Sequence, residues 1–506
     1  MMNLSDPDFG KRLFPFLIAG VLVCAAYAYQ VYACAASPLA YFPYLFTNSD
    51  MHANLLWAKS IREQGWLNPS PHHPYNDWMQ MLGTYDEWLK WWGGAPVFQQ
   101  SPLYAYLLAV AQWVSEDLIY VFVLQALGAI ALSACLGLIA AKVSGNRTAG
   151  WIGFGLAAAY APFLGYSQVL VRDTLGWLLI AGLILTLIQL DEKSDETRWR
   201  RRLSLTAGVL LGLGFLARES FALFIPVVWA VCLTRFWKRR DWASAALMTG
   251  ATCVVFVPLV LRNSAVGAPL FSTSNRFPEA FILGHARTAH PYRFVIPRET
   301  RNILEASEGK SGRLVAETLK THTGVGGWMS LQFRKAASLL DPFESADNVS
   351  LYYIEKISPL VRLGVKHWMI LVPGLGGLIL SLCWRDRRHF WLWILFPLTL
   401  ASVLVSLPLS RYRQPLALWW IPWTAFFIVS IIRMAAIQPR QAGGLAAAVV
   451  AGWILCLGPL ARHPRSAYDR PAEYKMALRV YEKLGQEDKA EAMRTLLREK
   501  FADARR

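Results

Sequence analysis

The sequence predicts an all-α polytopic membrane protein with about eleven transmembrane helices. Hydrophobic residues fill 55% of its 506 positions and charged residues only 17%, whereas soluble domains carry about 25% charged residues. Apolar runs of roughly 20 residues recur along the chain, which is the length that a helix needs to cross a bilayer. The runs are continuous and do not alternate with polar residues, which favours helices over a membrane β-barrel.

Eleven segments match this pattern. The run at 102–114 is also apolar, but counting it as a span would move every later loop to the other side, so we expect a helix near the interface or a partial insertion. The first span lacks a clear small-residue cleavage signal and is expected to stay uncleaved. The eleven predicted spans are 13–36, 119–141, 149–166, 171–190, 203–217, 219–234, 242–261, 367–383, 390–409, 414–432 and 442–461.

The net charge of +17 comes largely from short loops between spans. Clusters of Lys and Arg in such loops indicate the cytoplasmic side, which also places the N-terminus inside. This explains the basic balance without nucleic acid, so we expect no nucleic-acid binding. The seven cysteines all lie in hydrophobic spans and are read as core residues. The basic loops are 142–147, 191–202, 235–240, 384–389 and 433–440.

The opposite, outer side then receives the polar segments. A membrane domain, 1–461, contributes a first outer loop at 37–117 and a large outer loop at 262–366. The tail at 462–506 predicts two amphipathic helices, 471–484 and 486–502, broken at Gly485. One such hairpin cannot build a solenoid, so we expect a docking or capping element.

Asp50 is the central candidate residue, because it follows the first span in a loop rich in aromatic residues. A carboxylate near low-dielectric surroundings can be tuned to act as a general base. Asn48, Ser49 and Asp50 also precede a helical run at 52–64, and all three residue types cap helices well. The cap and the catalytic interpretation are compatible, since a cap on a rigid helix also fixes a carboxylate.

The first outer loop also offers weak metal candidates. His72, His73 and Asp77 carry suitable ligand atoms, but adjacent histidines on a Pro-rich loop are equally typical of an ordinary loop. No cofactor is therefore certain, and a divalent metal is an open alternative. No Gly-rich phosphate-cradling loop occurs in the right context.

Arginines occur at the outer ends of spans, where the positive-inside rule predicts few. Arginine suits bidentate phosphate recognition, so the group favours an anionic lipid headgroup. Internal salt bridges and snorkelling are the alternative for any single member. The group comprises Arg172, beside Asp173, and Arg218, Arg262, Arg411 and Arg413.

These residues resemble the GT-C superfamily of membrane glycosyltransferases, nearest to protein O-mannosyltransferases and lipid A aminoarabinose transferases. The resemblance covers about 10–435. Asp50 stands where the family has its loop-one catalytic acid, and Asp173 where it carries a second acid. The protein mannosyltransferases have an Asp-Glu pair, whereas Asp50 is followed by Met51 and His52. Further family-like segments are 99–104, 208–226, 261–263, 339–362 and 411–413.

The resemblance implies a GT-C-like fold and inverting transfer of a sugar from a polyprenyl-phosphate donor to a hydroxyl on a glycan, lipid or protein. Asp50 would be the base, and Asp173 would position the acceptor or a metal. The expected location is a bacterial inner membrane, with the loops and tail periplasmic. The expected lipid-phosphate and substrate residues are Arg172, Arg218, Arg262, Arg411, Tyr412, Arg413, His52, Gln100 and Tyr104.

Two other classes of function remain open. A lipid or sugar transporter or flippase predicts broken helices with polar residues at mid-membrane depth, whereas here the charges gather at span ends. A non-enzymatic scaffold explains the tail but not the outer arginines.

Overall fold

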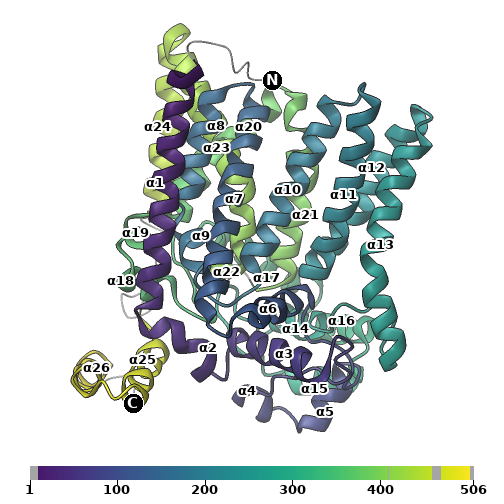
Figure 1. Cartoon of the computed structure of the whole chain (residues 1–506), viewed down its shortest axis with the longest axis vertical. Helices are drawn as coiled ribbons and strands as arrows, with labels where there is room; N and C mark the ends of the chain where they lie inside the picture. The colour runs from purple at the N-terminus through teal and green to yellow at the C-terminus, as the bar shows by residue number, and fades with distance from the viewer. Residues whose placement is uncertain (1–8, 408, 458–468, 502–506) are drawn as a thin grey trace.

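The computed structural model describes residues 9–407, 409–457 and 469–501, with side chains from residue 18 onward. This part of the chain is helical and contains no β-strand. Figure 1 shows its long helices running side by side. They are α1 (Phe9–Ala35), α7 (Leu118–Ser144), α8 (Arg147–Ala158), α10 (Asp173–Glu192), α11 (Thr197–Ala217), α12 (Phe224–Lys238), α13 (Trp242–Val266), α20 (His367–Cys383), α21 (Phe390–Val405), α23 (Ala417–Ile437) and α24 (Pro439–Leu457).

Within the described residues, eight helices are long and apolar enough to cross a membrane. Helices α8, α11 and α20 fall outside that set, so the count of eleven spans stays a prediction. The predicted span at 149–166 is interrupted: α8 ends at Ala158 and α9 (Ala161–Tyr166) follows. Backbone bonds explain the break, because Ala161 N donates to Val365 O at 2.9 Å and Val365 N to Ala159 O at 2.8 Å.

Glycines allow the closest helix pairs to meet. A Cβ at Gly208 of α11 would collide with the backbone of Met248 in α13, and one at Gly377 of α20 with the backbone of Trp423 in α23. Small residues at such crossings let backbones approach, which is how apolar helices pack in lipid.

The basic loops meet at one end of the bundle. Ion pairs join Lys142 to Glu192 and Arg235 to Asp191, and these four residues come from the ends of α7, α10 and α12. The shared end agrees with the expected common side of these loops; the side itself stays a prediction.

Short helices gather at the opposite end, with α2, α3, α6 and α14–α16 lying below the long helices in Figure 1. The run at 102–114 is one of them, and it packs against α3 and α7. These helices are α2 (Phe42–Leu45), α3 (Asp50–Gln64), α4 (Asp77–Gln80), α5 (Tyr85–Trp91), α6 (Leu103–Val114), α14 (Phe277–His285), α15 (Thr300–Ser307), α16 (Ser311–Lys320) and α17 (Val325–Ser338). The next two, α18 (Leu351–Ile357) and α19 (Pro359–Leu363), pack against α9.

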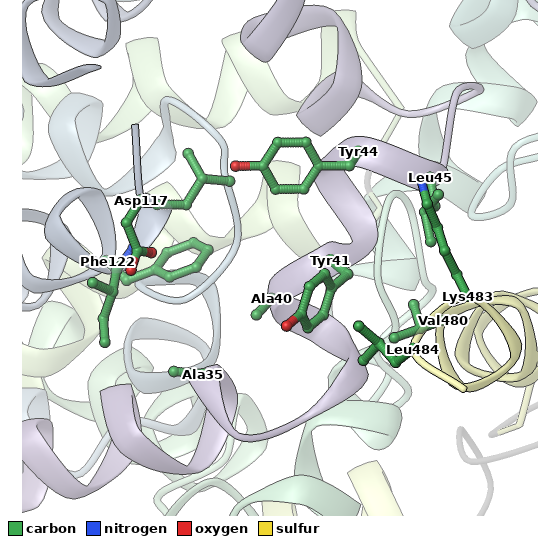
Figure 2. A pocket seen from close by; sticks show the side chains of 12 residues that line it. Ala35, Ala40, Tyr41, Tyr44, Leu45, Asp117, Phe122, Val480, Lys483 and Leu484 are labelled. Atoms are coloured by element: carbon green, nitrogen blue, oxygen red, sulfur yellow. The ribbon is translucent and has the colours of Figure 1, made fainter. Parts of the chain in front are cut away.

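The tail packs at this same end as α25 (Pro471–Lys483) and α26 (Glu487–Lys500). Tyr474, Ala477 and Val480 of α25 are buried in the main hydrophobic core. A half-open groove of about 720 Å³ lies between α25 and the ends of α1, α2 and α7. Figure 2 shows its lining, which includes Tyr44 and Lys483.

Candidate active site

Asp50 is the first residue of α3, and the cap of that helix is its neighbour. The Ser49 side chain accepts a bond from His52 N at 3.2 Å, which satisfies one of the free N–H groups of the first turn. Asp50 N donates to Asn348 Oδ1 at 2.6 Å. Because Ser49 fills the cap position, the carboxylate of Asp50 is free for other partners.

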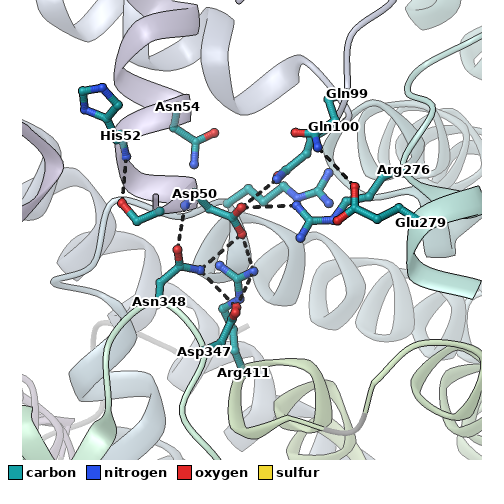
Figure 3. A network of polar contacts seen from close by, with 12 residues as sticks. Asp50, His52, Asn54, Gln99, Gln100, Arg276, Glu279, Asp347, Asn348 and Arg411 are labelled. Carbon is teal, nitrogen blue, oxygen red and sulfur yellow. Dashed lines mark hydrogen bonds and ion pairs between the residues drawn. The ribbon is translucent and has the colours of Figure 1, made fainter. Parts of the chain in front are cut away.

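Four donors surround the Asp50 carboxylate, as Figure 3 shows. Oδ1 accepts from Gln100 Nε2 at 3.1 Å and from Arg276 Nη1 at 3.3 Å. Oδ2 accepts from Arg411 Nη2 at 2.6 Å and from Asn348 Nδ2 at 3.2 Å. The side chain is 18% exposed. Asp50 is therefore an anion in a nearly closed cage of donors from four separate segments.

Arg411 is the second hub of the site. Its side chain is only 5% exposed, and its Nη2 lies 2.8 Å from Asp347 Oδ2 as well as beside Asp50. The same nitrogen donates to the Tyr412 hydroxyl at 2.8 Å, and Nε lies 3.5 Å from Asp173 Oδ2. One guanidinium thus lies beside three carboxylates: Asp50 and Asp347 meet the same Nη2, and Asp173 pairs with Nε without a hydrogen bond.

Asp173 connects the site to the helix bundle. Asp173 is the first residue of α10, and its carboxylate accepts a hydrogen bond from Arg218 Nη1 at 2.6 Å. Both side chains are buried. Gly176, one turn along α10, makes room for this arginine, because a Cβ there would lie 3.0 Å from Arg218 Cγ and closer still to Cδ. Arg172 faces Glu219 instead, at 2.9 Å.

The remaining expected residues lie away from the Asp50 carboxylate. Tyr104 donates to Gln125 at 2.7 Å, and the His52 ring bonds to Pro43 O at 2.8 Å. Arg262 binds the carbonyls of Leu67 and Asn68, and Arg413 binds Glu344 and the carbonyls of Asp341 and Phe343. These two arginines hold loops in place, so their guanidinium groups are already engaged.

The metal candidates bind separate partners. His73 bonds to Val97 O at 2.9 Å, and Asp77 accepts from Asn48 at 2.7 Å. Among the described residues no group of three or more His, Cys, Asp or Glu side chains is placed to hold a metal ion, so His72 joins no such group either. Arginines already contact both oxygens of Asp50 and of Asp173 and one oxygen of Asp347, which disfavours a divalent cation among them.

The carboxyl groups of the site differ in acidity. Burial favours the neutral form of Asp50, but the charges of Arg276 and Arg411 outweigh it and hold its pKa well below the usual range. Burial, helped by the negative charge of Asp50, raises the pKa of Asp347. Burial also raises the pKa of Glu279, which accepts one bond from Gln99 at 3.3 Å. Asp50 is therefore ionised throughout the working pH range.

Three residues that contact Asp50 or Arg411 were not predicted from the sequence to belong to the site: Arg276, Asp347 and Asn348. The sequence marks Asn348 only as part of a family-like segment. Arg276 and Asn348 lie 226 and 298 positions from Asp50. Each is an ordinary polar residue in a long loop, so no local pattern distinguishes it. The sequence could only have suggested that an isolated acid in one outer loop pairs with an arginine of another. The outer loops contain many arginines, so this expectation does not single out Arg276.

No protein-family model matches the sequence, and no curated protein matches it. Among solved structures, the chain is similar to the apo form of the Archaeoglobus fulgidus oligosaccharyltransferase, with 13% identity and a TM-score of 0.46 over 90% of this chain and 55% of the other.

A second structure of that enzyme, tethered to an acceptor peptide containing the NVT sequon, gives 13% identity and a TM-score of 0.45 over 88% and 56%. A third, the archaeal oligosaccharyltransferase AglB with an inhibitory peptide and a dolichol-phosphate, gives 13% and 0.37 over 82% and 56%. The chain spans about half the length of these enzymes.

Proposed function

We propose that the chain is an inverting glycosyltransferase that moves a sugar from a polyprenyl-phosphate lipid to a hydroxyl acceptor at the membrane surface. The observation that carries the proposal is the Asp50 cage, a buried cluster of arginines and carboxylates at one end of a bundle of apolar helices. A lipid donor lying along these helices would hold its phosphate at their ends, where this cluster lies. The site would face the side opposite the basic loops, which is the periplasm if the membrane is a bacterial inner membrane.

Arg276 is the residue best placed to bind the donor phosphate. Its side chain is 22% exposed, against 5% for Arg411. It also holds Asp50 by the longest of the four bonds, at 3.3 Å. The donor phosphate is an anion with two free oxygens, which a guanidinium can bind with two parallel bonds, whereas Arg276 now makes a single 3.3 Å bond to Asp50.

Binding of the donor would then activate Asp50. A carboxylate has about four lone-pair sites, and in this structure four donors occupy them. When Arg276 turns to the phosphate, Oδ1 of Asp50 regains a free site that an acceptor hydroxyl can use. The departure also removes one of the two arginine charges that lower the pKa of Asp50, so the carboxylate becomes a better proton acceptor.

The reaction follows from these positions. The acceptor oxygen forms a bond to the anomeric carbon from the face opposite the phosphate, which inverts that centre. The bond between the carbon and the phosphate oxygen breaks, and its electron pair leaves with the lipid phosphate. The hydroxyl proton passes to Asp50, while Arg276 stabilises the growing charge on the phosphate. Asp347 and Asp173 keep Arg411 neutralised when Asp50 becomes protonated.

The test measures transfer from a labelled polyprenyl-phosphate sugar by the reconstituted protein. Asp50→Asn is expected to lower kcat by about 100- to 10,000-fold, the usual contribution of a general base, while donor binding persists. Arg276→Gln is expected to raise the donor KM by roughly tenfold or more, because a charged hydrogen bond contributes about 1.5–3 kcal/mol.

Two matched controls separate these effects from general damage. Asp77→Asn removes a carboxylate of the same outer loop, one that accepts from Asn48 and lies outside the Asp50 cage. Arg287→Gln removes an exposed arginine that pairs with Glu299 in the same large loop. Both are expected to keep the wild-type rate. Full activity in Asp50→Asn would refute the role of Asp50. Tight donor binding by the wild-type protein without any turnover would favour the flippase alternative.

A further inference from the structure

The C-terminal tail touches the candidate active site through one loop, residues 347–350. Arg470, the residue before α25, donates from Nη1 to Asp347 O at 2.8 Å and from Nη2 to Asn348 O at 3.4 Å. Glu473, in the first turn of α25, accepts from Ser350 N at 2.8 Å. The tail therefore binds backbone groups at three of the four residues of this loop.

The side chains of Asp347 and Asn348, in the same loop, point into the Asp50 cage. Asn348 bonds to both the backbone and the carboxylate of Asp50, and Asp347 pairs with Arg411. Figure 3 shows both side chains beneath Asp50. The tail thus binds the backbone of this loop, while two side chains of the loop bind the residues of the candidate site.

The tail is fixed firmly enough to act as a support. Glu473 is fully buried and pairs with Arg470, whose Nε lies 3.0 Å from its Oε1. Tyr474 packs edge-on against Tyr353 of α18 with ring centroids 5.7 Å apart. Lys356 of α18 bonds to Asp469, just before α25. A buried carboxylate is costly without partners, so Glu473 defines one position for α25 relative to the loop.

We propose that Arg470 and Glu473 are positioning residues, through which the tail sets the placement of Asp347 and Asn348 against Asp50 and Arg411. This rests on the proposed transferase function. It changes the expectation for the tail from a docking or capping element to a structural part of the active site. A misplacement of about 1 Å at a catalytic group can cost roughly 100-fold in rate.

The experiment uses the full-length protein with Glu473→Gln and Arg470→Met. Both are expected to lower kcat by about 10- to 100-fold with the donor KM unchanged, because Arg276 is untouched. Arg470→Lys is expected to lie between wild type and Arg470→Met, since lysine restores the charge but not the fork that reaches two carbonyls. A purely structural role would lower the yield of folded protein and leave kcat per folded molecule unchanged, which would overturn the proposal.

Two controls lie in the tail itself. Arg494→Gln removes three ion pairs that stay within the tail, with Glu482, Glu487 and Glu491, and should leave kcat unchanged. Lys483→Ala alters the groove of Figure 2 and not the loop. If Lys483→Ala lowered kcat as much as Glu473→Gln, the tail would act through the groove, and the proposal would be wrong.

Hydrogen–deuterium exchange gives a measurement that does not depend on activity. The Ser350 amide is expected to exchange faster in Glu473→Gln than in wild type or Arg494→Gln, because its acceptor is weakened. Unchanged exchange would show that the tail does not hold the loop and would overturn the proposal. If wild type transferred no sugar, the proposed function would fail, while the exchange result would still decide whether the tail holds the loop.

Discussion

Replacing Gly176 by alanine tests whether the candidate site depends on the chain of contacts that runs from α10 to Arg411. A new Cβ would lie 3.0 Å from Arg218 Cγ and closer to Cδ, whereas carbon atoms prefer about 3.5–4.0 Å. Arg218 must therefore retreat by roughly 1 Å. Its bond to Asp173 is 2.6 Å long and buried, so this retreat breaks or lengthens it.

Gly182→Ala in the same helix is the matched control. Its Cβ would meet only Leu210 side-chain carbons at 3.8 Å, which is an ordinary contact. Both variants gain the same helix propensity of about 1 kcal/mol, so the difference between them isolates the clash. We expect Gly176→Ala to be less stable than Gly182→Ala by about 1–3 kcal/mol, the usual cost of overpacking.

The assay compares thermal unfolding, followed by intrinsic tryptophan fluorescence, with the rate of sugar transfer. Gly176→Ala is expected to lose up to about 100-fold in rate, because Asp173 no longer fixes Arg411, while Gly182→Ala keeps the wild-type rate. Equal stability and equal rate in the two variants would refute the reasoning that Gly176 exists to seat Arg218.

Three further predictions concern pH and metal. Arg276→Gln should shift the acid limb of the pH profile of kcat/KM to higher pH, because loss of the positive charge raises the pKa of Asp50. An acid limb at the wild-type pH would contradict this. Lys335 is buried against the carbonyls of Gly284 and Leu404, and burial lowers its pKa to about 7. Between that value and about 10.4, the pKa of an unfolded lysine, the folded state binds fewer protons than the unfolded state. Stability should therefore rise with pH in thermal unfolding, and Lys335→Met should abolish the rise. Chelation of divalent cations should leave transfer unchanged, and a loss restored by added metal would contradict the arginine-filled site.

The long helices follow from the sequence because their signal is local. The eight helices that are long and apolar enough to cross a membrane each overlap a predicted span, since apolar length and flanking charge decide where such helices form. The break at Ala159 and Tyr160 could not be predicted, because it depends on backbone bonds to Val365, about 200 positions away. A contact between distant segments leaves no mark in local periodicity.

The candidate site was predictable only in part, for the same reason. Asp50 stood out as an acid in the aromatic loop after the first span, and Arg411 as a charge at the end of a span, where charges are costly and rare. The structure brings both into one ion pair. Arg262 and Arg413 met the same criterion, yet they bind loop carbonyls, since the rule identifies an unusual charge but not its partner. Arg276 sits in a polar loop, where arginine is common, so nothing marked it.

The most direct test of the central claim is a structure of the full-length protein with polyprenyl phosphate bound. We expect the phosphate to contact Arg276 and this guanidinium to have left Asp50, whose Oδ1 then faces the acceptor side. A phosphate held elsewhere, for example in the groove beside Tyr44 and Lys483, with Arg276 still on Asp50, would contradict it.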